Sequence, residues 1–233
     1  MINTREFLQK EPRFEQQLLK QSDDSQLTPI INRGFYLPET LTKNSVLFVG
    51  INPSFNEKEG NKNLGFNFYP FDSSKLQDHD VFKNEIQYFR QMHRLLQYWT
   101  LSWSHLDIFC FRETNQNFVK ELMGTEEGRE FLKIQFTLFL ELLNLVKPKV
   151  IIVCNALARD IMNYESNYGS TIGVNLAYKF DEDIGTPRIT TEGPLKEIPI
   201  FFSSMLSGQR ALDRGSFQRL GWHINYALNF KKK

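Results

Sequence analysis

The stretch that decides the fold is SVLFVGINPS, residues 45–54. Residues 45–51 are almost entirely β-branched, aliphatic or aromatic, and Asn52-Pro53-Ser54 ends the run. A continuous apolar run of this length is typical of a strand covered on both faces, and such strands occur mainly in parallel sheets. The stretch therefore predicts a buried parallel strand that is followed directly by a loop.

Working outward, strands and helices alternate along the rest of the chain. Further strands are expected at 105–111, 149–155 and 198–205, and helices at 80–99, 125–147, 156–164 and 215–230. Strands that alternate with helices favour a parallel sheet with helices on both faces and right-handed crossovers. We therefore predict an α/β fold, a three-layer α/β/α domain around a four-stranded parallel sheet.

The domain is expected to cover residues 45–233, with residues 1–44 as a lead-in. Within the lead-in, residues 1–22 resemble a polar helix and residues 23–44 a loop rich in Pro, Asn, Thr and Ser. Residues 174–191 are expected to form a polar hairpin or flap. Residues 55–79 form a connection longer than the ~12 to 15 residues of a passive loop, and long loops often serve a site.

Composition excludes several classes of protein. The chain has 233 residues, with 41% hydrophobic and 24% charged, which is ordinary globular usage and argues against disorder or coiled coil. A formal net charge of +1 gives no overall basic field, so any nucleic-acid site must be local. The two cysteines, Cys110 and Cys154, are too few for an iron–sulfur cluster or a Cys-only zinc site and are expected to be buried thiols.

The N-terminus lacks the apolar stretch of a secretory signal, and no apolar run reaches the ~18 to 20 residues that span a bilayer. We therefore expect a cytoplasmic protein with no membrane partner.

Two loops follow expected core strands and carry residues suited to chemistry. Ligands of parallel α/β sheets bind at the carboxyl ends of the strands, which singles out residues 50–54 and 205–210. In the first loop, Gly50 lets a ligand approach the backbone, Pro53 fixes the turn, and the Asn52 amide could orient water or a carbonyl group. The alternative is an Asx-turn at a strand end.

The first loop also carries a family resemblance. VLFVGINPS resembles the first motif of the uracil-DNA glycosylase superfamily, a strand ending in Gly-x-Asn-Pro or Gly-x-Asp-Pro, and is closest to the mismatch-specific uracil and thymine glycosylase branch. Residues 65–68, Gly-Phe-Asn-Phe, are similar to that branch's Gly-Phe-x-Phe segment. The resemblance implies that Asn52 positions a water, that the Ile51 backbone meets the base, and that Phe68 stacks on a flipped base.

Other residues near these motifs are substrate-binding candidates. They are Gly50, Pro53, Ser54 and Phe66, of which Phe66 could equally pack on the core. Ser54 stands where the strictly uracil-specific branch carries a bulky Tyr, so the resemblance implies room for a substituent on the fifth carbon of the base. Aromatic stacking is worth ~1 to 3 kcal/mol per base, enough for one ring to hold a flipped pyrimidine.

The second loop is similar to the superfamily's second motif. Met205-Leu206-Ser207 matches Met-Pro-Ser with Leu in place of Pro, which makes Met205 and Ser207 the catalytic candidates. Gly208, Gln209 and Arg210 then occupy the place of the wedge that fills the gap in the duplex and contacts phosphate. Branches with His at the Met205 position use it against charge on the departing base, which methionine cannot do. A shifted register over residues 202–204 and a plain strand-to-helix turn are the alternatives.

The resemblance implies a DNA-repair glycosylase, a monomer that hydrolyses the N-glycosidic bond of uracil or a related deaminated base and needs no metal or cofactor. One alternative is a catalytically weak or inactive member of the fold that binds nucleic acid or a nucleobase. Another is a hydrolase or transferase acting on a small nucleoside-like molecule. Near-neutral charge leaves all three open.

The remaining ionisable residues carry weaker signals. The four histidines, His79, His93, His105 and His223, lack the spacing of a metal site. Asp107 and Arg112 could border the site or form an ion pair, and we favour the ion pair. A local phosphate-binding rim is conceivable, although charges at such positions are usually only solvated. Its members would be Lys58, Lys62, Arg210 and Arg214.

Overall fold

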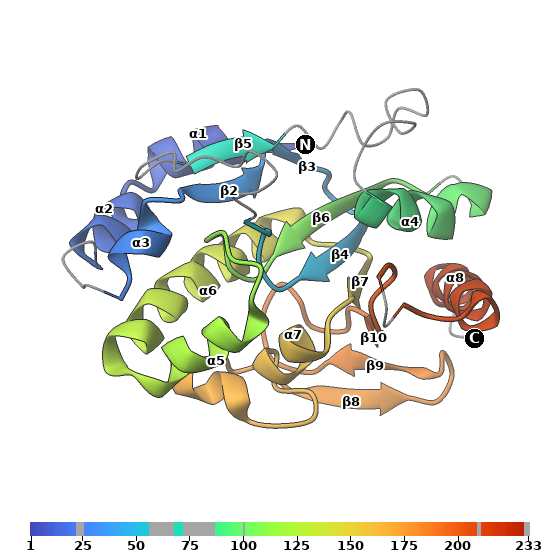
Figure 1. The fold of residues 1–233 in the computed structure, drawn as a ribbon. Helices are drawn as coiled ribbons and strands as arrows, with labels where there is room; N and C mark the ends of the chain where they lie inside the picture. Colours follow the sequence, from blue (N-terminus) through green and yellow to red (C-terminus); the bar gives the residue numbers. More distant parts are fainter. Residues whose placement is uncertain (22–25, 56–67, 72–86, 100, 209–210, 231–233) are drawn as a thin grey trace.

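The computed structural model describes residues 1–21, 26–55, 68–71, 87–99, 101–208 and 211–230 (Figure 1). Its centre is one sheet of four parallel strands in the order β10-β7-β4-β6. The strands are β4 (Val46–Gly50), β6 (Trp103–Asp107), β7 (Val150–Val153) and β10 (Ile200–Phe202). The predicted four-stranded parallel sheet is therefore confirmed.

The register of the strands brings their carboxyl ends to one edge. Gly50 at the end of β4 pairs with Asp107 at the end of β6, and Val153 pairs with both Val49 and Phe202. The loops that follow these strands therefore leave the sheet at the same level, where ligands of parallel sheets bind.

Helices cover both faces of the sheet (Figure 1). Side chains alternate along β4, so that Leu47 and Val49 join one core cluster while Val46 and Phe48 join the other. The first cluster is closed by α5 (Gln116–Gly124), α6 (Glu126–Val146) and α7 (Ala156–Ile161), and the second by α4 (Gln87–Leu96) and α8 (Arg214–Asn229). The short helix η5 (Gln97–Trp99) follows α4 directly. The expected three-layer α/β/α fold is confirmed.

The longest helix, α6, begins and ends where its sequence predicts. Thr125 is the N-cap, and its hydroxyl accepts a hydrogen bond from the Gly128 N–H at 3.1 Å. Lys147 ends the helix in the left-handed conformation, at φ 47°, directly before Pro148. α5 was not expected and lies directly before the Thr125 cap.

The lead-in is more structured than expected. The single helix expected over residues 1–22 is two helices, because Pro12 lacks the N–H that a continuous helix would need. Phe14 and Leu18 of the second helix are buried in the same core cluster as α6. The elements are β1 (Ile2–Asn3), α1 (Thr4–Lys10), α2 (Arg13–Lys20), α3 (Thr28–Ile31), β2 (Phe35–Pro38) and β3 (Thr40–Leu41).

Two smaller sheets flank the main one. β2 pairs in parallel with β5 (Phe68–Phe71), which belongs to the long connection after β4. The expected hairpin is confirmed as the antiparallel pair β8 (Tyr178–Asp181) and β9 (Thr186–Ile189), which follows η6 (Tyr168–Ile172). The Thr186 hydroxyl donates to the Ile200 carbonyl at 2.7 Å and ties the hairpin to β10. Within the described ranges, no helix is long and apolar enough to cross a membrane.

Candidate active site

A cavity of about 640 Å³ opens at the carboxyl edge of the main sheet. This volume falls within the range of about 300–1,000 Å³ that is usual for small-molecule sites. Its described walls come from the loops after β4, β6, β7 and β10, and from β2 and α4 on the outer sides. The residues are Tyr36, Leu37, Pro38, Gly50, Ile51, Asn52, Pro53, Ser54, Phe89, His105, Asp107, Arg112, Glu113, Thr114, Gln116, Cys154, Asn155 and Met205.

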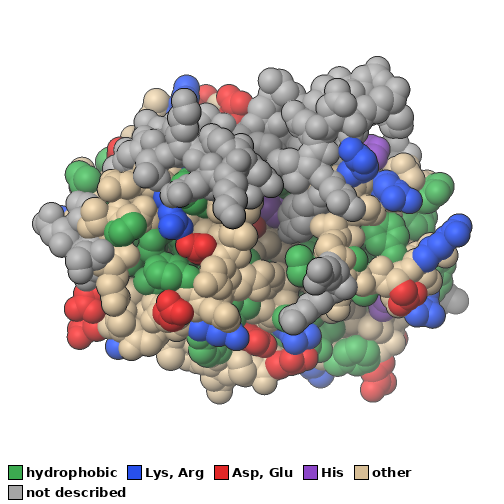
Figure 2. All heavy atoms as spheres, viewed as in Figure 1, with side chains coloured by type: hydrophobic (Ala, Val, Ile, Leu, Met, Phe, Trp, Pro, Cys, Tyr) green, Lys and Arg blue, Asp and Glu red, His purple; other side chains and the backbone are tan. Residues whose placement is uncertain are grey.

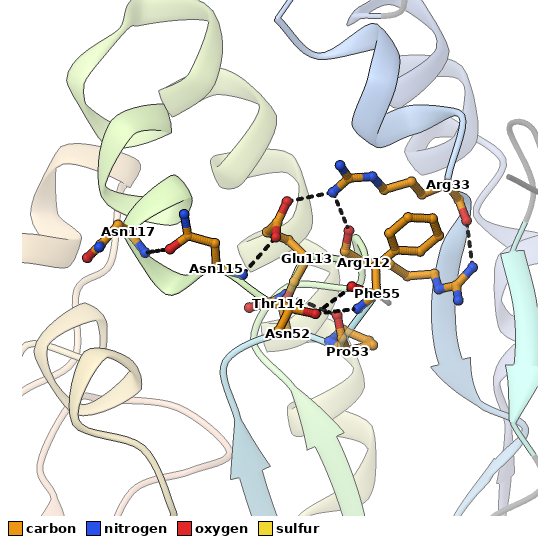
Figure 3. A network of polar contacts seen from close by, with 9 residues as sticks. All are labelled: Arg33, Asn52, Pro53, Phe55, Arg112, Glu113, Thr114, Asn115 and Asn117. Atoms are coloured by element: carbon orange, nitrogen blue, oxygen red, sulfur yellow. Dashed lines mark hydrogen bonds and ion pairs between the residues drawn. The ribbon is translucent and has the colours of Figure 1, made fainter. Parts of the chain in front are cut away.

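Asn52 lines this cavity with its side-chain amide held in one orientation (Figure 3). Its Nδ2 donates to the Glu113 carbonyl at 2.6 Å and to the Pro53 carbonyl at 3.1 Å. Both amide donors are thus used, and Oδ1 has no hydrogen-bond partner among the residues that the structure describes. Asn52 therefore presents a fixed acceptor.

The loop that carries Asn52 is tied to the segment after β6. The Glu113 N–H donates to the Pro53 carbonyl at 2.9 Å, and the Phe55 N–H donates to the Thr114 hydroxyl at 3.0 Å. The Glu113 carboxylate pairs with Arg33 at 2.5 Å and also accepts from the Asn115 N–H (Figure 3). Two loops far apart in sequence are thereby held as one rigid wall.

Arginine and aromatic side chains pack against each other next to these loops, and Figure 3 shows Arg33, Phe55 and Arg112. The Arg112 guanidinium lies 4.4 Å from the centre of the Tyr36 ring and 4.9 Å from that of Phe55, and it donates to the Arg33 carbonyl at 2.9 Å. The Arg33 guanidinium also packs on the Phe55 ring, 4.7 Å from its centre. Such cation–π contacts are worth about 0.5–2 kcal/mol each.

Gln135, a polar residue in the apolar stripe of α6, anchors the same segment from the core. Its Oε1 accepts from the Cys110 and Phe111 N–H groups, both at 3.0 Å, and the side chain is buried. Gln135 is a single amide at a core position of α6, and this feature could have indicated an anchoring role. Our sequence interpretation missed it.

Gln135→Leu should therefore lower the free energy of unfolding by about 2–3 kcal/mol, because two buried N–H groups lose their acceptor. Denaturant unfolding monitored by circular dichroism measures the change. Thr137→Ala, an exposed substitution on the same helix, serves as the control and should change the free energy by less than about 0.5 kcal/mol. An equal effect of the two substitutions would contradict the anchoring role.

His105 and Asp107 form a buried pair at the carboxyl end of β6. His105 Nε2 lies 3.5 Å from Asp107 Oδ1, and the two side chains are 7% and 16% exposed. Burial lowers the pKa of His105 to about 3 and raises the pKa of Asp107 to about 8, so both groups are mainly neutral at pH 7. The favoured ion pair between Asp107 and Arg112 is wrong, because Asp107 borders the cavity beside His105 instead.

The second predicted loop contributes one side chain to the described walls. Met205 lines the cavity, and its carbonyl accepts from the Leu212 N–H at 3.0 Å to close the loop. Leu206, which stands in the place of the motif's proline, is buried in the second core cluster and anchors the loop. Ser207 is not among the residues that line the cavity. Gly208 has φ +86°, a conformation that suits glycine.

Several predicted site residues fall outside what the structure describes. These are Phe66, Gln209 and Arg210, together with Lys58, Lys62 and His79. Phe68 lies in β5, where the backbone alone is described. Its strand runs beside β2, whose Tyr36, Leu37 and Pro38 line the cavity and were not expected to do so.

The cavity also contains Cys154, but not as a nucleophile. Burial raises the pKa of its thiol above the ordinary value, so the reactive thiolate is suppressed. Asn155 Oδ1 is already used, because it accepts from the Ala158 N–H as the cap of α7. Among the residues with described positions, no group of three or more His, Cys, Asp or Glu side chains could hold a metal ion.

Comparisons with protein-family models, with curated proteins and with solved structures find no match to this chain. A function must therefore be argued from the chemistry of the cavity.

Proposed function

We propose that this protein is a DNA glycosylase that hydrolyses the N-glycosidic bond of uracil or a related deaminated base. The observation that carries the proposal is Asn52, an amide locked through its nitrogen with its oxygen left as an acceptor in a cavity at the carboxyl edge of the sheet. Such a group can orient a water for attack on the sugar carbon without itself becoming charged.

The residues around Asn52 suggest roles in binding the base and in the attack of water. The backbone N–H groups of Ile51 and Asn52 have no acceptor among the described residues, so they are available to a carbonyl of the base. A neutral amide is a poor base, so water attacks late, when the sugar is already oxocarbenium-like. Met205 offers no charge or hydrogen-bond donor to the departing base, and we therefore expect slow chemistry.

Ser54 leaves room for a substituted base. It is an exposed residue on the cavity wall with a small side chain. The expected substrates therefore include uracils with a substituent on the fifth carbon as well as uracil.

A binding protein is the second candidate function, and Met205 is the observation that favours it. A pocket without a polar group against the departing base could retain base recognition and lack hydrolysis. A hydrolase of small nucleoside-like molecules is the remaining alternative, and these three functions differ in the products that they form.

The test is a gel assay for alkali-labile abasic sites on single-stranded, G·U and G·T oligonucleotides, with free deoxyuridine assayed in parallel. The proposal expects abasic sites in uracil-containing DNA and no cleavage of the free nucleoside. Bound but intact DNA would support the binding protein, and cleavage of the nucleoside alone would support the small-molecule hydrolase.

Affinity for DNA should be modest and should fall with salt. Among the described residues on the face shown in Figure 2, Lys and Arg are interspersed with Asp and Glu, so we expect few phosphates to be neutralised at once. Each phosphate contact adds about 0.9 to the slope of log K against log salt. Arg210→Ala should lower that slope by about one contact, whereas Lys133→Ala, on the exposed side of α6, should leave it unchanged. Fluorescence anisotropy titrations at several salt concentrations measure the slope. Equal slopes for the parent, Arg210→Ala and Lys133→Ala would contradict the phosphate role of Arg210.

A further inference from the structure

Asp107 is a carboxyl group in the cavity that the mechanism above does not use. It ends β6, lies on the cavity wall and is 16% exposed. The register of β4 and β6 places it beside Gly50, two residues before Asn52, and both Asp107 and Asn52 line the cavity. A ligand that fills the cavity can therefore contact both the Asn52 amide and this carboxyl.

Among the described residues, no cation pairs with Asp107 in a way that would stabilise a carboxylate. On its own strand, His105 is its one ion-pair partner among the described residues, and burial keeps that imidazole neutral. Cys110 and Cys154 are buried thiols whose pKa values are raised, so they are neutral as well.

Two further charged residues on the described part of the cavity wall are engaged elsewhere. Glu113 pairs with Arg33, and Arg112 is stacked on the Tyr36 and Phe55 rings. β4 contributes only the Gly50 backbone at this point. Burial without compensation raises the pKa of Asp107 to about 8, so the carboxyl holds its proton at pH 7.

We propose that the carboxyl group of Asp107 is the specificity-determining group that reads the hydrogen-bonding edge of the base. This role rests on the proposed function and names the class of base that the site accepts. A protonated carboxyl has one O–H donor beside one carbonyl acceptor. It pairs with an edge that offers a carbonyl beside an N–H, as in uracil, and equally with an edge that offers a ring nitrogen beside an amino group, as in cytosine.

The ionised form would behave differently. A carboxylate only accepts hydrogen bonds, so it would repel the carbonyl oxygen of uracil or the ring nitrogen of cytosine. Base recognition should therefore be present below about pH 8 and lost as the pH rises through the pKa of Asp107. Discrimination between uracil and cytosine in duplex DNA would then come from the ease of opening a mismatched pair.

The test measures binding without hydrolysis. The probes are single-stranded oligonucleotides with one 2′-fluoro-2′-deoxyuridine, 2′-fluoro-2′-deoxycytidine or N3-methyl-2′-fluoro-2′-deoxyuridine, whose fluorine slows bond cleavage. For the parent protein at pH 7, the uracil and cytosine probes should bind within about threefold of each other and more tightly than the N3-methyl probe. At pH 9 both should bind about tenfold more weakly, because a pKa of about 8 leaves only a minority of Asp107 protonated.

Asp107→Asn is the matched variant, because an amide also offers one donor edge and one acceptor edge but does not titrate. It should bind both probes at pH 7 and lose no more affinity at pH 9 than ionisation of the probe itself explains. Asp107→Ala should not distinguish the uracil probe from its N3-methyl form at either pH.

Three results would overturn the proposal: no base-dependent binding at pH 7, the same pH profile for the parent and Asp107→Asn, or full discrimination by Asp107→Ala. These outcomes are separable from the proposed function. The predicted binding pattern without release of uracil would leave Asp107 as the reading group and remove the hydrolase. Release of uracil together with probe binding that does not change with pH would support the hydrolase and remove Asp107 as the reading group.

Discussion

Asn52→Ala is expected to lower single-turnover excision of uracil from a G·U duplex by about 10²-fold or more, while DNA affinity changes by less than about threefold. The substitution removes the fixed Oδ1 acceptor that would orient the attacking water, a contact that matters in the transition state. In the proposed mechanism, ground-state binding would rely on stacking, phosphate contacts and the reading edge, none of which involves this oxygen. Rapid-quench kinetics and an anisotropy titration on the same duplex measure the two effects.

Thr114→Val is the control that separates the loss of the Asn52 acceptor from the loosening of the two loops. Asn52 also holds the Glu113 and Pro53 carbonyls, so its loss loosens the wall as well as removing the acceptor. The Thr114 hydroxyl joins the same two loops, because it accepts from the Phe55 N–H and donates to the Phe55 carbonyl, and it has no role in the proposed chemistry. Thr114→Val should lower stability while excision falls less than tenfold. Full activity of Asn52→Ala would remove the water-orienting role.

Gly50→Ala is expected to cost about 2–3 kcal/mol of unfolding free energy and to abolish base-dependent binding. A Cβ atom at position 50 would lie 2.1 Å from Asp107 Oδ1 and 3.1 Å from His105 Nε2. The strand is fully buried in the centre of the sheet, so the chain cannot move aside cheaply. Either β4 shifts or the carboxyl leaves its place, and both outcomes damage the cavity.

A double-mutant cycle identifies the cause of that loss. In an Asp107→Ala background the closest atom is gone, so Gly50→Ala should cost at least about 1 kcal/mol less than in the parent. Gly124→Ala is the control, because a Cβ there would meet nothing within 4 Å. Additive effects at positions 50 and 107 in urea denaturation would show that the carboxyl is not what requires the glycine.

The main sheet and its helices could be predicted because each has a strong local signal. β4 and β7 are unbroken apolar runs, and α6 has a threonine cap, a long apolar stripe and a terminal proline. The convergence of residues 50–54 and Met205 on one cavity also followed from local signals, because parallel strands end at one edge.

The missed features depend on tertiary contacts. The lead-in was interpreted as a helix and a loop, yet β2 in this segment forms a wall of the cavity through a parallel pairing with β5. Nothing in the sequence near Tyr36 indicates that partner. Asp107 was expected to form an ion pair with Arg112, with a place at the border of the site as the alternative. The pleat of β6 instead places Asp107 beside His105, two residues away on the same face.

The central claim is that a base is cut from DNA in the cavity at the carboxyl edge of the sheet. The most direct measurement is chromatographic detection of free uracil after the protein is mixed in excess with a G·U duplex, with Asn52→Ala measured beside it. The account predicts one free uracil for each abasic site in the parent reaction and almost none with the variant. A parent protein that binds the duplex and releases no free base, or a variant that releases as much as the parent, would contradict it.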